Sequence, residues 1–132
     1  MKLDYIEFYS GDAERKGTAV PTSMNTNIAI GKAEAKNSTL SIEFEYGVLY
    51  VPDQSYIRMK GRASFTGPEA QKSYAEWAKS KVITGPHGEY VFNAIYYHST
   101  INALLISKSF GMMPPINLPT LKTGANPAAQ KK

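Results

Sequence analysis

The sequence predicts an α+β fold, in which a four-stranded antiparallel meander sheet is followed by a crossover helix and a long C-terminal helix packed on one face. Three observations support this class. Apolar and polar residues alternate with period two between Met24 and Phe65, as in strands with one buried face. An amphipathic stretch comes next, and a long uncharged stretch follows it. Strands followed by helices are typical of α+β domains.

The length and composition fit one globular domain. A chain of 132 residues with 42% hydrophobic and 20% charged residues can form one core. We predict a single domain over residues 1–123 and a disordered tail over residues 124–132, which shows no apolar periodicity. The absence of cysteine excludes disulfides and thiolate chemistry. A cytoplasmic location is expected, because the N-terminal stretch has no signal-peptide hydrophobic region.

The first two strands are predicted from shorter patterns. One strand is expected over residues 2–9, ended by Gly11 and Asp12. In the next strand Met24, Ile28 and Ile30 alternate with polar or small residues. A turn with an odd number of residues at 36–38 would align even-numbered residues of this strand with even-numbered residues of the third.

The third and fourth strands form the clearest hairpin. Even-numbered positions are apolar over residues 38–51, whereas odd-numbered positions are apolar over residues 56–65. A turn of even length at residues 52–55 pairs even with odd positions, so both apolar sets lie on one face of the sheet.

The same register predicts a row of opposite charges on the other face. It places Glu43 and Glu45 near Lys60 and Arg62. Such cross-strand pairs stabilise a sheet by about 0.2–1 kcal/mol each. An ion ladder is therefore the simplest explanation of the basic residues on this face.

Residues 66–69 are predicted to begin the crossover helix. Thr66 can cap a helix, Pro68 suits its first turn, and Glu69 completes a capping box. We expect the helix to span residues 68–80, with Tyr74 and Trp77 on its apolar side.

The second helix is expected over residues 89–110, after a break at residues 84–88 and before a stop at Gly111. The stretch from 90 to 107 carries no charge and allows three interpretations. A membrane span is disfavoured by its central polar residues, which are costly in lipid. A pair of buried strands is compatible with the composition, although no turn residue interrupts the run. A helix with contacts on more than one side is the third.

The third interpretation gives the helix two apolar faces. A monomer of this size buries one such face, so a second face predicts homo-oligomerisation as a dimer or tetramer. The face predicted to lie on the sheet comprises Val91, Ala94, Ile95, His98, Ile101, Leu105 and Ser109. The face predicted to form the oligomer interface comprises Phe92, Tyr96, Asn102 and Ile106.

The order of elements resembles that of the SecB protein-export chaperones. Three segments carry the resemblance: residues 6–12 resemble the end of the family's first strand, residues 56–65 its fourth strand, and residues 101–121 the end of its long helix with the following Pro-x-Leu-Asn-Leu-type run. The resemblance implies a SecB-like fold and subunits that assemble as a dimer of dimers.

The resemblance also implies a holdase chaperone that binds non-native polypeptides in apolar grooves without catalysis. Flexible and aromatic apolar side chains suit such grooves, although each of them can equally be an ordinary core residue. The client-binding residues predicted in this way are Ile57, Met59, Phe65, Tyr74, Trp77, Met112 and Met113.

The charges of this chain depart from the family pattern. SecB proteins use acidic residues on the exposed sheet face to reach the SecA motor. Here that face is expected to carry Arg58, Lys60 and Arg62, which makes a SecA-type motor a doubtful partner.

Two other function classes were weighed. An enzyme is disfavoured because His87 and His98 match no usual zinc spacing and no carboxylate pair lies nearby, so we predict no catalytic residue, metal or cofactor. Single-stranded nucleic-acid binding is disfavoured because Glu43 and Glu45 would partly neutralise the basic residues. It would use one row of side chains on the sheet: Tyr56, Arg58, Lys60 and Arg62.

Overall fold

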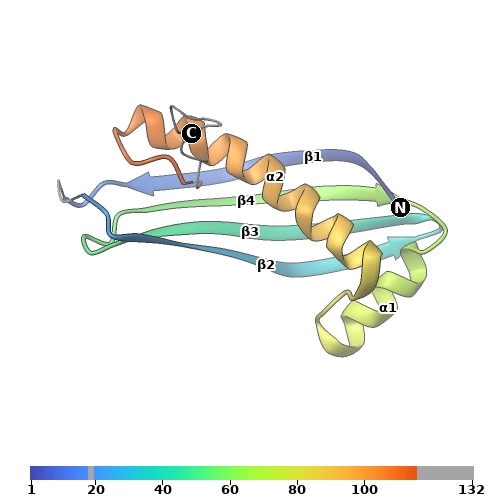
Figure 1. Cartoon of the computed structure of the whole chain (residues 1–132). Coiled ribbons are helices and arrows are strands. Elements are labelled where there is room, and N and C mark those ends of the chain that lie inside the picture. The colour runs from blue at the N-terminus through green and yellow to red at the C-terminus, as the bar shows by residue number, and fades with distance from the viewer. Residues whose placement is uncertain (18–19, 116–132) are drawn as a thin grey trace, which may run out of the picture.

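The computed structural model describes residues 1–17 and 20–115 and confirms the α+β class. The predicted tail and the run after residue 115 lie outside the described residues. The elements follow one another as β1 (Lys2–Glu14), β2 (Ser23–Lys36), β3 (Thr39–Val51), β4 (Tyr56–Thr66), α1 (Ala70–Ser80) and α2 (Gly85–Ser109) (Figure 1).

The sheet order is β1-β4-β3-β2, and every pairing is antiparallel. The predicted meander of all four strands would have placed β1 beside β2. Only β2, β3 and β4 form a meander, and β1 pairs with β4 instead. Two ion pairs on the exposed face accompany the pairing of β1 with β4. The guanidinium of Arg62 on β4 lies 3.5 Å from the carboxylate of Glu7, and that of Arg58 lies 3.1 Å from Asp12.

The predicted hairpin between β3 and β4 is confirmed. Even positions of β3 face odd positions of β4, as in the pair Tyr46 and Met59. Glu45 lies opposite Lys60, and the two side chains form an ion pair of 3.9 Å. Glu43 lies opposite Arg62, as the register predicted.

The predicted even-to-even alignment between β2 and β3 is confirmed over residues 23–30 but not over residues 32–36, and its cause differs from the predicted one. Ile30 faces Phe44, so even positions do meet even positions. The turn, however, has only two residues between the pair Lys36 and Thr39, and Asn37 in this turn has a φ of 55°. The extra residue that shifts the pairing from even-with-odd to even-with-even is instead Gly31, a bulge with no counterpart on β3.

Bulges occur only in the two edge strands of this sheet. In β1 the register shifts at Asp4 and at Tyr9, and in β2 it shifts at Gly31. The central pairing of β3 with β4 is regular over its whole length. The apolar positions change between even and odd numbers across each bulge. Because a bulge adds one unpaired residue, the apolar side chains before and after it still point to the same face of the sheet.

The core lies between one face of the sheet and the two helices. The alternating apolar side chains of β3 and β4 are buried here, and α2 crosses the strands diagonally while α1 lies at one end (Figure 1). One cluster joins α1 and the first half of α2 to the sheet, and a second lies under the last half of α2. The opposite face of the sheet, which we call the open face, carries the charges.

The crossover helix is present, but the predicted capping box is not. Thr66 ends β4, and its hydroxyl bonds the carboxylate of Asp4 instead of a helix N–H. Glu69 is the N-cap residue and makes no side-chain cap bond. The threonine was misassigned because a strand residue and a capping residue look alike in sequence.

The helix interpretation of residues 90–107 is confirmed, and α2 begins four residues before the predicted start. Gly85 has a φ of 73°, and Pro86 occupies the first turn, so the predicted break is itself the helix start. The predicted stop is confirmed by Gly111, which has a φ of 68°. Within the described residues, neither helix has the length and apolar content to cross a membrane.

The face of α2 on the sheet differs from the predicted face in its second half. Val91 and Ile95 are buried as predicted, but Ile101, Leu105 and Ser109 are exposed. The buried positions follow a spacing of four residues instead: Ile95, Ser99, Ala103 and Ser107. Small side chains at three of these four positions let the helix backbone lie close to the sheet.

Candidate functional site

Three predicted client-binding residues are core residues. Ile57, Met59 and Phe65 project from β4 beneath the helices, and each is at most 3% exposed. They cannot contact a client while the helices stay on the sheet. The alternation that predicted them identifies the buried face of a strand, and that face is covered here.

The two predicted residues of α1 lie at the far end of the molecule. Trp77 is 8% exposed and belongs to the core cluster against which Tyr74 packs. The ammonium of Lys81 lies 4.1 Å from the centre of the Trp77 ring and covers it. Figure 1 shows α1 at one end of the sheet and the C-terminal end of α2 at the other. These residues therefore do not share a site with the methionines that follow α2.

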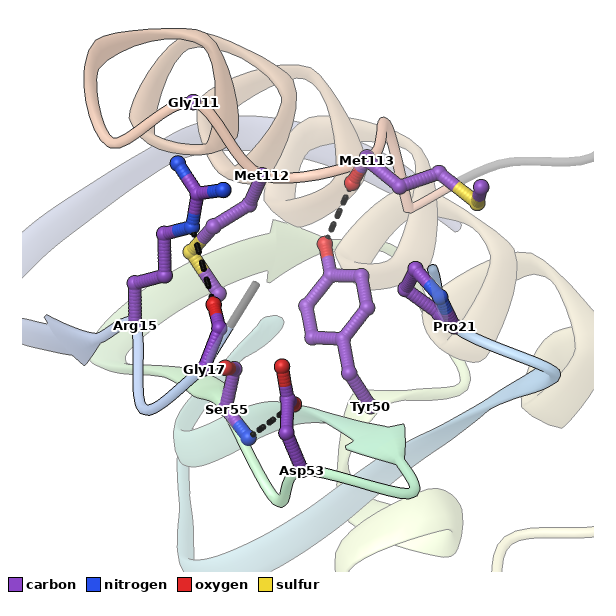
Figure 2. Close-up of a pocket in the computed structure, with 9 residues that line it drawn as sticks. All are labelled: Arg15, Gly17, Pro21, Tyr50, Asp53, Ser55, Gly111, Met112 and Met113. Carbon is purple, nitrogen blue, oxygen red and sulfur yellow. Dashed lines mark hydrogen bonds between the residues drawn. The ribbon is translucent and has the colours of Figure 1, made fainter. Parts of the chain in front are cut away.

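Met112 and Met113 lie in the segment after α2, over residues 111–115, which folds back onto the sheet end. The phenol of Tyr50 donates a hydrogen bond of 2.6 Å to the carbonyl of Met113. Figure 2 shows the two methionine side chains on opposite sides of the Tyr50 ring. Met112 packs on the core, whereas Met113 is 40% exposed.

Burial fixes the position of the Tyr50 ring. Tyr50 is 1% exposed, and its burial raises the pKa of the phenol to about 12. This shift matters only at alkaline pH, because a phenol is protonated at neutral pH in any case. The buried ring and its hydrogen bond together hold the segment after α2 at the end of the sheet.

A small hollow lies beside Tyr50, and both methionines are among its lining residues. It has a volume of about 40 Å³, and Arg15, Asp53 and Ser55 are among its lining residues (Figure 2). The guanidinium of Arg15 bonds the carbonyl of Gly17, and the backbone N–H of Ser55 lowers the pKa of Asp53 by bonding its carboxylate. These polar groups bond one another, and the hollow is too small for a polypeptide segment.

A larger open groove lies on the Met113 side. Its volume is about 390 Å³, and it runs between the start of β2, the middle of α2 and the segment after α2. None of the described residues that line it carries a charge at neutral pH. The groove is lined by Pro21, Thr22, Ser23, Met24, Thr26, Tyr96, Met113 and Pro115.

The groove has two chemically different walls. Thr22, just before β2, and Ser23 and Thr26 on β2 supply hydroxyl groups, whereas Tyr96 and Met113 supply apolar surface. Met113 is the only residue of the groove that was predicted to bind clients. Tyr96 was predicted for the oligomer interface, and the remaining lining residues were missed. They come from three separate segments, and only the folded chain brings them together.

The exposed side of α2 forms a second apolar surface. Tyr97, Ile101 and Leu105 follow one another at intervals of four residues and form what we call the α2 ridge. They are 63%, 44% and 62% exposed. Of the predicted interface residues, Phe92 and Tyr96 are exposed, while Asn102 is half-buried and Ile106 packs against the core.

The open face of the sheet is charged but balanced. Arg58, Lys60 and Arg62 pair with Asp12, Glu45 and Glu7 respectively. The hydrogen bond from Arg58 lowers the pKa of Asp12. Two guanidinium groups also lie on tyrosine rings, Arg58 on Tyr56 at 4.4 Å and Arg62 on Tyr9 at 4.8 Å. The basic row is thus engaged within the sheet, which does not favour a polyanion as its partner.

The described part of the chain contains no group of three or more His, Asp or Glu side chains that could hold a metal ion. Arg15 and Asp53 line the small hollow and do not line the groove. Among the described residues, the lining of the groove holds no acid-base pair.

Comparisons with known proteins support the fold. No model of a known protein family matches the chain, and no curated protein matches its sequence. The chain is similar in structure to the Mycobacterium tuberculosis SecB-like chaperone Rv1957, solved in complex with a ChAD peptide from the HigA1 antitoxin Rv1956. The TM-score is 0.58 at 12% identity, over 92% of this chain and 90% of that chain. The fold is therefore SecB-like, as the sequence predicted.

Proposed function

We propose that this chain, with its SecB-like fold, is a holdase chaperone that binds unfolded polypeptides in the cytoplasm without a chemical step. The observation that carries the proposal is the groove between β2, α2 and the segment after α2. The peptide bound to the structurally similar chaperone supports a polypeptide as the ligand class.

The lining of the groove suits many clients. Met24 and Met113 are unbranched and flexible, so they can adapt to different apolar side chains. Tyr96 offers a large apolar surface with few rotatable bonds, which suits a binding site. Tyr50 fixes the backbone at Met113, so the side chain of Met113 can adapt while its wall stays in place.

We further propose that the chain assembles into a homo-oligomer through the exposed side of α2. The α2 ridge, together with Phe92, would leave a large apolar surface in water if the chain stayed monomeric. Phe92 is one of the interface residues predicted from the sequence, whereas Tyr96 lines the groove. Ile106 serves the core in the described structure and is not part of this apolar surface.

The test measures suppression of aggregation by the full chain. A reduced, unfolded client would be diluted with and without the protein, and light scattering would follow its aggregation. We expect the wild type to suppress aggregation and to form a stable complex with the unfolded client only. Met113→Asp should weaken the complex about tenfold, because a carboxylate would be desolvated against the apolar wall of the groove.

The matched control is Val82→Asp. Val82 is 53% exposed and lies in the connection between α1 and α2, away from the groove. The substitution Val82→Asp introduces the same charge at an exposed apolar position and should leave client binding unchanged. Equal loss in both variants would mean that added charge, and not the groove, determines binding. A wild type that ignores unfolded clients would disprove the holdase proposal.

A further inference from the structure

The two edges of the sheet differ in how well they resist a further strand. Natural sheets protect their edges with bulges, charges and prolines. On β1, bulges at Asp4 and Tyr9 leave regular stretches no longer than residues 10–14. On β2, the bulge at Gly31 separates two regular stretches. The stretch over residues 32–36 is short and charged, and the stretch before the bulge is longer and uncharged.

That longer stretch, Ser23–Ile30, is the exception, and we call it the edge segment. Its eight residues pair with β3 without a shift, and they contain no charged residue and no proline. No described strand pairs with its outer side. In an antiparallel strand about every second residue directs its N–H and C=O away from the existing neighbour. The edge segment therefore offers about four residues with free backbone groups.

The groove lies beside the start of this edge segment. Ser23, Met24 and Thr26 belong to both the edge segment and the lining of the groove. A strand that pairs with β2 would continue the sheet and would direct alternate side chains to the helix side, where the apolar walls lie. The other side chains would project on the open face beside Asn25 and Asn27.

We propose that the edge segment receives an uncharged, extended stretch of a client polypeptide as an added strand, with alternate apolar side chains in the groove. This inference rests on the proposed chaperone function and deepens it by defining the client class. The segment is about eight residues long, to match the edge segment. The absence of charge from the lining selects against charged stretches of either sign, because their charges would have no partner there.

The experiment uses the full chain and three fluorescent octapeptides. The first alternates valine or isoleucine with threonine. The second has lysine in place of two inward valines. The third has the first sequence, N-methylated at positions on both of its edges, so that its side chains remain but its N–H donors do not. We expect the first peptide to bind at least about tenfold more tightly than either of the others, with little dependence on salt.

The protein variant that tests the edge is Asn25→Lys with Asn27→Lys. Both asparagines are exposed and face away from the groove, so the substitution charges the edge without changing the groove lining. The first peptide should lose about tenfold in affinity, as charge on an edge strand resists pairing. The control, Ser10→Lys, adds one lysine to the exposed edge strand β1 and should have no effect.

The outcomes separate the two proposals. If unfolded clients bind the wild type and the doubly substituted variant equally, or if N-methylation has no effect, the client lies in the groove by side chains alone and the edge inference is overturned. If the wild type binds no unfolded client, the chaperone proposal itself has failed. If the protein without peptide has the mass of an assembly that Asn25→Lys with Asn27→Lys dissociates, the edge joins copies of this chain, which also overturns the inference.

Discussion

At the residue scale, Tyr50 joins the core to the candidate site. Its ring belongs to the core cluster under the second half of α2, and its hydroxyl holds the carbonyl of Met113 at the wall of the groove. One side chain therefore couples the stability of the sheet end to the position of the binding surface.

The raised pKa of Tyr50 makes stability depend on alkaline pH. The phenol titrates near its ordinary value of 10.0 in the unfolded chain and at about 12 in the folded chain. Below pH 10 both states are protonated. Between these values only the unfolded state loses the proton, so the free energy of unfolding should fall by up to about 1.4 kcal/mol per pH unit. Above both values the stabilising contribution of this protonated phenol is lost.

Tyr50→Phe is the variant that tests this coupling. At neutral pH it should lower the free energy of unfolding by about 0.5–1.5 kcal/mol, because one hydrogen bond is lost and the ring remains. Its alkaline decline should be shallower than that of the wild type, with the remainder due to groups such as Tyr46, whose pKa burial also raises. Urea unfolding from pH 8 to 12 measures both effects. Tyr97→Phe, at an exposed position, is the control, and equal pH profiles for the wild type and Tyr50→Phe would contradict the assignment.

The sequence predicted single site residues only in part. Met113, which lines the groove, was predicted because it follows a helix stop and precedes prolines, where a core position is unusual, and its role in client binding stays a prediction. Ile57, Met59 and Phe65 were misassigned because a strand pattern marks the apolar face without telling whether it is covered. The bond between Tyr50 and Met113 joins residues 63 positions apart, and no local pattern contains it.

At the scale of elements, α2 fits the sheet through small side chains. Ser99, Ala103 and Ser107 face the sheet over the second half of the helix, and Ala103 is fully buried. A search for large apolar residues assigned Ile101 and Leu105 to this face, whereas the close approach of helix and sheet requires small ones. The composition of α2 therefore misleads about its orientation.

Ala103→Leu should disturb this packing. The added atoms would press on the cluster that contains Tyr46 and Met59, and overpacking of this kind destabilises by about 1–3 kcal/mol. Chemical denaturation monitored by circular dichroism measures the change. Asn93→Leu, at an exposed position of the same helix, should have a much smaller effect. Equal stability of Ala103→Leu and the wild type would mean that the helix does not lie close to the sheet.

The sequence predicts the boundary of an element where the backbone needs a conformation that favours one residue type. Gly111 ends α2 as expected, since its left-handed φ favours glycine. The start of α2 was missed because Gly85 and Pro86 resemble a loop as much as a first helical turn. The bulge at Gly31 was missed because an odd-length turn explains the same alignment of β2 with β3.

At the scale of the whole molecule, the fold class followed from the order of strands and helices, whereas the place of β1 did not. Alternation tells which face of a strand is apolar and leaves open which neighbours it pairs with. Acidic residues of β1 pair with the basic row of β4 on the exposed face, but exposed ion pairs contribute only about 0–1 kcal/mol each and are compatible with this order without determining it. The groove could not be predicted, because it arises only where β2, α2 and the segment after α2 meet.

The α2 ridge predicts how the proposed assembly should respond to charge. Leu105→Asp should lower the solution mass of the protein, since a carboxylate at a position that is 62% exposed in one chain would be desolvated in an interface. Light scattering measures the mass, and circular dichroism verifies that the fold is retained. Val82→Asp should leave the mass unchanged. A wild type that is monomeric at high concentration would refute an interface at the ridge.

The effect of deleting a residue from an edge strand should depend on whether that residue is a bulge. Gly31 has no counterpart on β3, so a chain without it would keep Ile28 and Ile30 toward the helices. Loss of Ala29 would instead turn one of these isoleucines to the charged side. By the same reasoning, Asp4 and Tyr9 are surplus to the alternation of β1. Descendants of this sequence can therefore lose one residue at any of these three points while the alternation of the strand is kept.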